Sequence, residues 1–309
     1  GYLYVLVFLY GIATAMFVPT LSSSVPFMVS RRQYTAANAL LQSTTSIGIA
    51  VGPVLSGLGI AMASSQDVLC VNAITYLASA ACLFPIRLPL VAPSSADRNA
   101  ISTTIRDLIE VLRYALITQR TIVFLIVTAS LYTFATGAFT TLFPVFGRKL
   151  LDLGPVEVGY LWSWLGIGLF VVSLALIWLT EWDLGRRVRA IAISSAVAGA
   201  AVCALVWAHN LLLATVLVAI IGIGIGTLTP IAWGILQEVS PAGMVGRVMA
   251  IYTAIATATS MAGMTFFGWI SQELSERSGV IGIGIVLFIM AIFTAWFSRW
   301  VRRLEYSAG

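Results

Sequence analysis

The side chains that most often perform acid–base catalysis or bind metal ions are few in this sequence. Histidine occurs once, as His209, and the three cysteines are Cys70, Cys82 and Cys203. These residues do not have the spacing of a zinc site, a redox pair or a disulfide framework, and the cysteines are expected to be small packing residues. We therefore expect no metal and no cofactor, and the lack of a catalytic cluster argues against an enzyme.

The twelve acidic residues are the other candidates for proton chemistry. None lies near the middle of a long apolar stretch, where the proton-carrying acid of a membrane pump is usually found. Glu181, Asp183 and Glu238 lie at the ends of such stretches, and for Glu238 we favour an ion pair with Arg247 across the loop that separates them. If protons drive this protein, the acid that carries them lies at a helix end or outside these 309 residues.

Composition indicates the surroundings for which the chain is suited. Hydrophobic residues make up 60% of it and charged residues 9%, with a net charge of +5, whereas a soluble domain is about 45–50% apolar and about 25% charged. So few charges cannot cover a soluble globule of this size, and the basic residues do not gather on one solvated face. A soluble enzyme, a disordered chain and a nucleic-acid-binding domain are excluded, and an all-α membrane protein is predicted.

Nine stretches are long and apolar enough to cross about 30 Å of hydrocarbon as helices. Helices are expected because the backbone must satisfy its own hydrogen bonds in lipid, and no stretch alternates in polarity as a barrel strand would. The predicted spans are residues 2–24, 37–62, 68–86, 121–144, 157–180, 188–208, 211–235, 246–270 and 279–301.

The basic residues predict how these spans are oriented. If the first span ends in the cytoplasm, fourteen of the 17 lysine and arginine residues fall on the cytoplasmic side, and only Arg148, Lys149 and Arg277 fall outside. Cytoplasmic loops of membrane proteins are enriched in such residues. We therefore expect a multi-pass protein whose C-terminus is cytoplasmic.

One loop, residues 87–120, is long enough to contain structure of its own. It begins with prolines and serines, which is typical of a linker, and continues with a helical stripe of apolar residues whose opposite face is charged. The stripe consists of Ile105, Leu108, Ile109, Leu112 and Leu116. We expect an amphipathic helix on the cytoplasmic membrane surface. The alternative is a helical extension of the next span.

The sequence also repeats itself with an offset of 211 residues over about 55 residues without a gap. The matched pairs include Gly11 with Gly222, Pro19 with Pro230, Ala39 with Ala250, Gly52 with Gly263, and Gly57 with Gly268. The first two spans therefore repeat the seventh and eighth in the same orientation, as in transporters built from two halves. The second half has six spans and the first shows three, so we expect an N-terminally truncated part of a twelve-span protein. The expected parts are a partial first half at 1–86, a linker at 87–120 and a six-helix half at 121–309.

The second predicted span contains a pattern of small residues around a proline. The residues are Ala39, Gly48, Gly52, Pro53, Ser56 and Gly57. Small residues every four positions allow membrane helices to approach closely, and a proline bends a helix. The pattern resembles the antiporter motif in the fifth helix of the major facilitator superfamily, with Ala39 and Ser56 in place of two glycines. A close, bent contact is expected to seal the outer side between the halves, and the alternative is tight packing with no role in gating.

The resemblance to this superfamily extends over the whole chain, as the last nine of twelve helices in a two-half helical bundle. Residues 25–29, 37–41, 237–241 and 246–249 are similar to the enterobactin-exporter and macrolide-efflux branch. A weaker similarity, to the family's motif loop, implies a cytoplasmic gate. Its residues would be Asp183, Arg186, Arg187, Glu238 and Arg247.

The geometry of the superfamily also implies which residues line the transport path and bind substrate. They are Gln42, Thr45, Ser46, Tyr132, Thr136, Trp162, Thr229, Trp233, Tyr252 and Thr257. Hydroxyl groups and aromatic rings without charge suit a neutral or amphipathic solute. For Trp162, Trp233 and Tyr252 the alternative is a role in packing or at the membrane interface.

The function that the resemblance implies is secondary active export of hydrophobic or amphipathic small molecules, such as drugs or siderophores, by alternating access. The expected partners are the small-molecule substrate, the lipid bilayer and a coupling proton moved by antiport, with no nucleic acid. The protein is expected to be a monomer in a bacterial cytoplasmic (inner) membrane. Two alternatives stay open, namely transport of lysophospholipids or other lipids, and a membrane subunit that scaffolds a complex without transporting.

Overall fold

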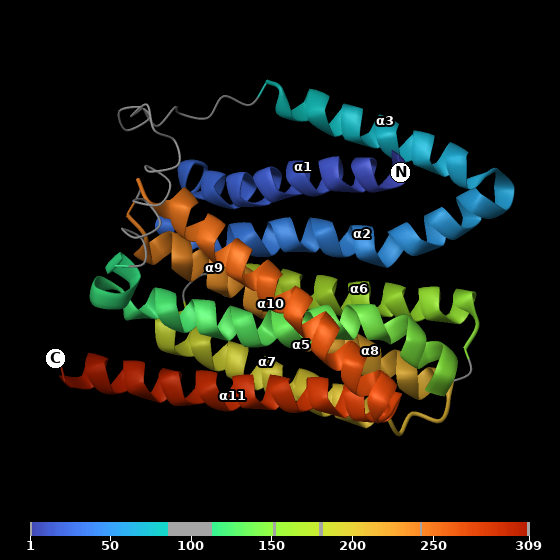
Figure 1. The fold of residues 1–309 in the computed structure, drawn as a ribbon. Helices are drawn as coiled ribbons and strands as arrows, with labels where there is room; N and C mark the ends of the chain where they lie inside the picture. The colour runs from blue at the N-terminus through green and yellow to red at the C-terminus, as the bar shows by residue number, and fades with distance from the viewer. Residues whose placement is uncertain (1, 86–112, 151–152, 179–181, 242, 308–309) are drawn as a thin grey trace.

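The computed structural model of the protein describes residues 2–85, 113–150, 153–178, 182–241 and 243–307. Within these ranges the chain forms helices and no strands, as Figure 1 shows. The helices are α1 (Tyr2–Ser24), α2 (Tyr34–Met62), α3 (Ser65–Leu83), α5 (Arg120–Leu150), α6 (Pro155–Ile177), α7 (Leu184–Leu205), α8 (Leu211–Ile225), α9 (Leu228–Val239), α10 (Val245–Glu273) and α11 (Glu276–Ser307). In this part of the chain nine segments have the length and hydropathy of membrane spans, which confirms the predicted number.

The span predicted at residues 211–235 is two helices, so the expectation of one continuous helix is wrong there. Helix α8 ends at Ile225 and α9 begins at Leu228. Pro230 has no N–H to donate to the carbonyl of Gly226, and glycine itself has low helix propensity. The carbonyl oxygen of Ile225, at the break, accepts a hydrogen bond from the hydroxyl of Tyr132 at 3.0 Å. The break therefore lies against α5, in the middle of the bundle.

The helices after the long loop pack into one bundle, and α1 and α2 lie along one side of it (Figure 1). Helix α2 contacts α6 and α9, and α1 contacts α10. Helix α2 bends in its second half, which contains Pro53, in agreement with the bend expected from that proline (Figure 1). Helix α3 lies outside α1 and α2, and none of its described side chains is buried. The contact between α2 and the bundle is therefore the main junction between the two groups of helices.

The two ends of the bundle differ in charge. Most of the described arginines lie at the end on the left in Figure 1, which we call the basic end. It contains the end of α1, the starts of α2, α5 and α7, and the end of α9. The opposite end contains the α2–α3, α5–α6, α7–α8 and α10–α11 connections. At that end Ser64 accepts a hydrogen bond from the backbone N–H of Asp67 and caps α3, and Asn210 caps α8 in the same way. These caps satisfy backbone groups that a helix cannot satisfy internally.

The predicted amphipathic helix falls almost entirely at residues 86–112, outside the described ranges, and stays a prediction. Residues Tyr114–Thr118 form one π-helical turn. Gln119 follows with φ of −128° and ψ of 75°, which is not helical, so this turn is not a continuation of α5. The hydroxyl of Tyr114 donates a hydrogen bond to the carbonyl of Val239 at 3.1 Å and attaches the turn to the end of α9.

Candidate functional site

One cavity in the bundle lies between α5, α9 and α10 and has a volume of about 370 Å³. Its lining residues are Tyr132, Thr133, Thr229, Trp233, Tyr252, Thr253, Ala256, Thr257, Ser260, Met261 and Met264. Helices α5 and α10 are held closely together beside it, because the hydroxyls of Thr133 and Thr259 lie 2.7 Å apart and Gly263 contacts the backbone of Phe134. Small residues permit this approach.

The second cavity lies between α2, α5 and α6 and has a volume of about 320 Å³. Its lining residues are Gln42, Ile49, Tyr132, Thr133, Thr136, Gly137, Thr140, Trp162, Leu165, Leu169, Ile225 and Ser260. Tyr132, Thr133 and Ser260 line both cavities, so the two are adjacent. Because α2 belongs to one group of helices and α5 and α6 to the other, this cavity lies at the junction between the groups.

The structure brings together eight of the ten residues expected on the transport path. Gln42, Thr136 and Trp162 line the second cavity, Thr229, Trp233, Tyr252 and Thr257 line the first, and Tyr132 lines both. The other two, Thr45 and Ser46, line neither. Ser46 is fully buried and donates to the carbonyl of Gln42 at 2.8 Å, and Thr45 is exposed and donates to that of Leu41 at 3.3 Å. Thr45 and Ser46 follow Gln42 by three and four residues, so helical periodicity places them near its face of α2. Their short side chains nevertheless bond back to their own helix and do not reach the cavity.

Five cavity residues on α10 were not expected from the sequence, namely Thr253, Ala256, Ser260, Met261 and Met264. Counting three or four residues along the helix from Tyr252 and Thr257 places them on the same face. That periodicity is the signal that could have found them. The two methionines add flexible apolar surface, which adapts to solutes of different shape.

The chemistry of the two cavities is uncharged. Their lining contains hydroxyl groups, one amide, aromatic rings and aliphatic side chains, and no acidic or basic side chain. Among the described residues, no three histidine, cysteine or acidic side chains are close enough together to hold a metal ion. The arrangement can bind a solute by apolar contact and hydrogen bonds, and offers no counter-ion for a charged one.

The ionic groups expected to form a gate lie at the basic end. Arg187 pairs with Glu238 at 2.6 Å and also donates to the hydroxyl of Thr35 at 3.4 Å. The pair that we expected between Glu238 and Arg247 is therefore wrong in its partner, because the fold places the start of α7 beside the end of α9. Arg186 pairs with Asp183 at 3.2 Å, but both side chains are largely exposed and such pairs contribute little.

A buried amide cluster lies beside this ion pair and joins the two groups of helices. The side-chain N–H of Asn38 on α2 donates to Gln237 on α9 at 2.7 Å, and Gln237 donates to the backbone carbonyl of Ser22 on α1 at 2.5 Å. All three residues are buried. The side-chain oxygen of Asn38 has no hydrogen-bond partner. Gln237 therefore connects both α1 and α2 to the bundle at the basic end.

We expect replacement of Gln237 to be more costly than replacement of Asn38. Gln237→Leu leaves a buried donor on Asn38 and the carbonyl of Ser22 without partners, and should lower the free energy of unfolding by about 2 kcal/mol. Asn38→Leu leaves the side-chain oxygen of Gln237 without its donor, but it also removes the Asn38 oxygen that is already unsatisfied. It should therefore lower the free energy of unfolding by only about 1 kcal/mol. Detergent-induced unfolding followed by tryptophan fluorescence measures both. Equal losses would contradict the assignment of Gln237 as the connecting residue.

The predicted small-residue face of α2 does not make the close contact expected of it. A methyl group added at Gly48 or Gly52 would meet no atom within 4 Å among the described residues, and Pro53 and Ser56 are exposed. Helix α2 packs with a different face, which includes the fully buried Ala39, itself part of the motif. The surroundings of Gly57 are not among those that the structure describes. Gly48 and Gly52 therefore make no close contact among the described residues, and the packing and gating expected of the motif stay a prediction.

Close contact between the groups is made instead by glycines of the bundle. A methyl group at Gly166 on α6 would lie within 3 Å of the backbone of Ala50 on α2, and one at Gly234 on α9 would meet Thr35. These glycines have no side chain to separate the helices, so α2 lies directly on α6 and α9. The contact holds Gln42 and Ile49 against the second cavity.

Membrane-spanning helices in two groups, with cavities at their junction, have the architecture of secondary transporters. Residues 1–264 match the Major Facilitator Superfamily, and the chain belongs to this family of transporters. It is a multi-pass membrane protein. The structure is similar to the crystal structure of the human organic anion transporter MFSD10 (TETRAN), with a TM-score of 0.73 over 90% of this chain and 67% of that one. The identity of 15% limits that likeness to the fold.

Two curated proteins are similar in sequence. The multidrug efflux pump Tap of Mycolicibacterium fortuitum is 23% identical over 279 residues, which cover 88% of this chain and 65% of Tap. The uncharacterized MFS-type transporter y4rN of Sinorhizobium fredii is 28% identical over 165 residues, covering 52% of this chain and 39% of that protein. The chain thus spans less than two thirds of the length of either relative.

Proposed function

We propose that this protein exports neutral or amphipathic hydrophobic small molecules as a secondary transporter. The observation that carries the proposal is the uncharged lining of two adjacent cavities at the junction of the helix groups. A charged solute would need an opposite charge at this depth, because burying an unpaired ion in a low-dielectric site costs several kcal/mol. Similarity to the multidrug efflux pump Tap supports both the direction of transport and the substrate class.

The contacts at the basic end support alternating access. Asn38, Gln237 and Ser22 join the two groups of helices there, and Arg187 reaches Thr35 across the same junction. We place the basic end in the cytoplasm on the strength of its arginines. In that orientation these contacts join the two groups on the cytoplasmic side. Uptake of substrate from that side in this proposal requires Gln237 to leave its two partners.

Proton antiport is the energy source that we propose. Because no acid lines either cavity, the proton carrier in this proposal is an acid at a helix end or one outside these 309 residues. The half-buried Glu238 is less suited, since its carboxylate is held by Arg187. Sensitivity of transport to a protonophore separates proton coupling from other energy sources.

Efflux of Nile red, a neutral lipophilic dye, from cells that express the full-length gene product tests the proposal. We expect efflux that a protonophore abolishes. The triple variant Gln42→Ala, Tyr132→Ala and Trp233→Ala should lower the efflux rate about tenfold or more, because losing about 1.4 kcal/mol of substrate binding is a tenfold effect. These three residues line the cavities from α2, α5 and α9.

A matched control uses the two path residues that the structure places outside the cavities. The double variant Thr45→Ala and Ser46→Ala should retain efflux, because both hydroxyls bond only to the backbone of their own helix. Unchanged efflux in the triple variant would overturn the cavity assignment. If the folded protein exports no dye but moves lysophosphatidylethanolamine between leaflets, lipid transport would replace the proposal. If it moves neither compound, a scaffold role would be favoured.

A further inference from the structure

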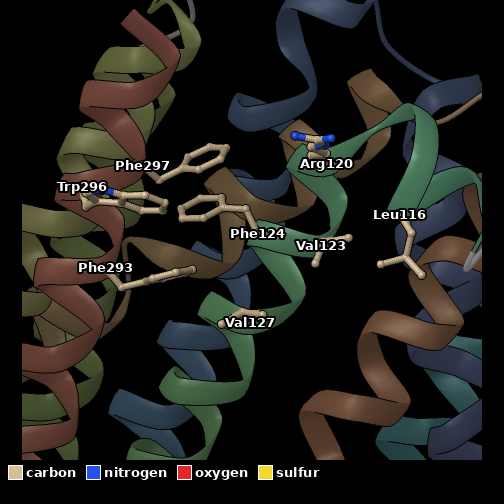
Figure 2. Close-up of a pocket in the computed structure, with 8 residues that line it drawn as sticks. All are labelled: Leu116, Arg120, Val123, Phe124, Val127, Phe293, Trp296 and Phe297. Atoms are coloured by element: carbon tan, nitrogen blue, oxygen red, sulfur yellow. The ribbon is translucent and has the colours of Figure 1, made fainter. Parts of the chain in front are cut away.

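A third cavity lies away from the two described above, between α5 and α11 near the basic end (Figure 2). Its volume is about 430 Å³, and it shares no lining residue with the central cavities. On α5 it is lined by Arg120, Val123, Phe124 and Val127, which recur every three or four residues and so occupy one face of the helix. We call this cavity the α5–α11 groove.

The floor of the groove is aromatic and well packed. The rings of Phe124 and Phe297 are stacked with centroids 3.6 Å apart and planes 6° from parallel, and both side chains are buried. Phe293 stacks on Phe124 at 5.4 Å, and Figure 2 shows the three rings facing one another across the gap between α5 and α11. A floor held by such contacts is formed before any ligand arrives, so binding costs little reorganisation.

The sides of the groove open outward from the bundle. Val127 is 39% exposed and Trp296 is 62% exposed, although each belongs to a segment with the length and hydropathy of a membrane span. Surface at this position meets acyl chains rather than water. Trp296 also lies close to the end of its span, at the depth where exposed tryptophans usually meet the headgroup region.

The mouth of the groove carries a positive charge. Arg120 is the first residue of the span that α5 forms, its side chain is exposed, and it takes part in none of the ion pairs formed by the described residues. Figure 2 shows its guanidinium above the aromatic floor, at the basic end. An unpaired guanidinium beside an apolar groove matches the two parts of an anionic lipid, because it forms paired hydrogen bonds with phosphate oxygens.

We infer that the α5–α11 groove binds one anionic phospholipid of the surrounding bilayer. The phosphate lies on Arg120, and one acyl chain lies along Val123, Val127 and Phe293. Val127 lies seven residues after Arg120, which is about 10 Å along the helix and takes the acyl chain from headgroup depth into the hydrocarbon. The lipid is not cargo, because the groove is separate from the central cavities. This inference depends only on membrane insertion and stands apart from the proposed substrate.

Native mass spectrometry of the full-length protein, reconstituted in nanodiscs of phosphatidylglycerol and phosphatidylcholine, tests the preference for an anionic headgroup. The wild-type protein should retain phosphatidylglycerol preferentially. Arg120→Gln should reduce that preference about fivefold, the size expected for one basic side chain at an anionic bilayer surface. Arg299→Gln is the matched control, because Arg299 is exposed on α11 at the same end and does not line the groove. An equal loss in both variants would show general surface attraction and overturn the site.

Photocrosslinking identifies what occupies the groove without depending on the charge variants. A benzophenone amino acid at position 127, which is partly exposed and tolerates a large side chain, should acquire the mass of a phospholipid on irradiation in the same nanodiscs. Val123→Trp, which fills the groove, should remove that adduct. A cross-link to another part of the same chain would assign the groove to an intramolecular contact, and the absence of any lipid adduct would equally overturn the inference.

Discussion

Replacement of Arg187 by methionine is expected to destabilise the protein more than any other single loss of charge. The side chains of Arg187 and Glu238 are only 14% and 23% exposed, and they lie 2.6 Å apart. Removing one partner leaves the other as an uncompensated buried charge, which typically costs about 3–5 kcal/mol. The guanidinium also donates to the carbonyl of Trp182 at 2.8 Å and to Thr35, so several contacts of the basic end are lost together.

The control for this prediction is the neighbouring arginine. Arg186 pairs with Asp183, but both side chains are largely exposed, so Arg186→Met should change the free energy of unfolding by less than about 1 kcal/mol. The double variant Arg187→Met and Glu238→Leu should recover part of the loss, because no buried charge remains. Unfolding in detergent measures all three. Similar values for Arg186→Met and Arg187→Met would contradict the buried ion pair.

The second large effect is expected at Gly166, where α6 meets α2. A methyl group there would already lie within 3 Å of the backbone nitrogen and Cα of Ala50, and valine adds two more carbon atoms. Because backbone cannot move aside as a flexible side chain can, Gly166→Val should cost about 3 kcal/mol and push α2 away from α6. The second cavity lies at this contact, so efflux should fall as well.

Gly48 provides the matched comparison on α2 itself. The same substitution, Gly48→Val, places its side chain in open space among the described residues and should change stability by less than about 1 kcal/mol. Unfolding free energies of the two variants decide between two locations for the close contact. If Gly48→Val is the more damaging, the small-residue motif of α2 makes the close contact after all, and the glycines of α6 and α9 do not.

The spans, their number and the gathering of arginines at one end follow from the sequence alone. Each of these features is local, because a stretch of about twenty apolar residues must form a helix in lipid whatever its neighbours are. The sequence alone also predicts that the cavities are uncharged, because no charged residue lies in the middle of the described spans. Eight of the ten path residues lie on cavities, but these were implied by the resemblance to the superfamily rather than by local properties of the sequence.

The tertiary structure decided which faces of the helices meet. Thr45 lies three residues from Gln42 and yet lines no cavity, and Glu238 pairs with Arg187, 51 residues away, instead of the nearer Arg247. The close contact is made by Gly166 rather than Gly48. Each outcome depends on how two helices from distant parts of the chain are rotated and tilted against each other. Apolar residues all around a helix leave that rotation undetermined in the sequence, and only the packing of the whole bundle selects it.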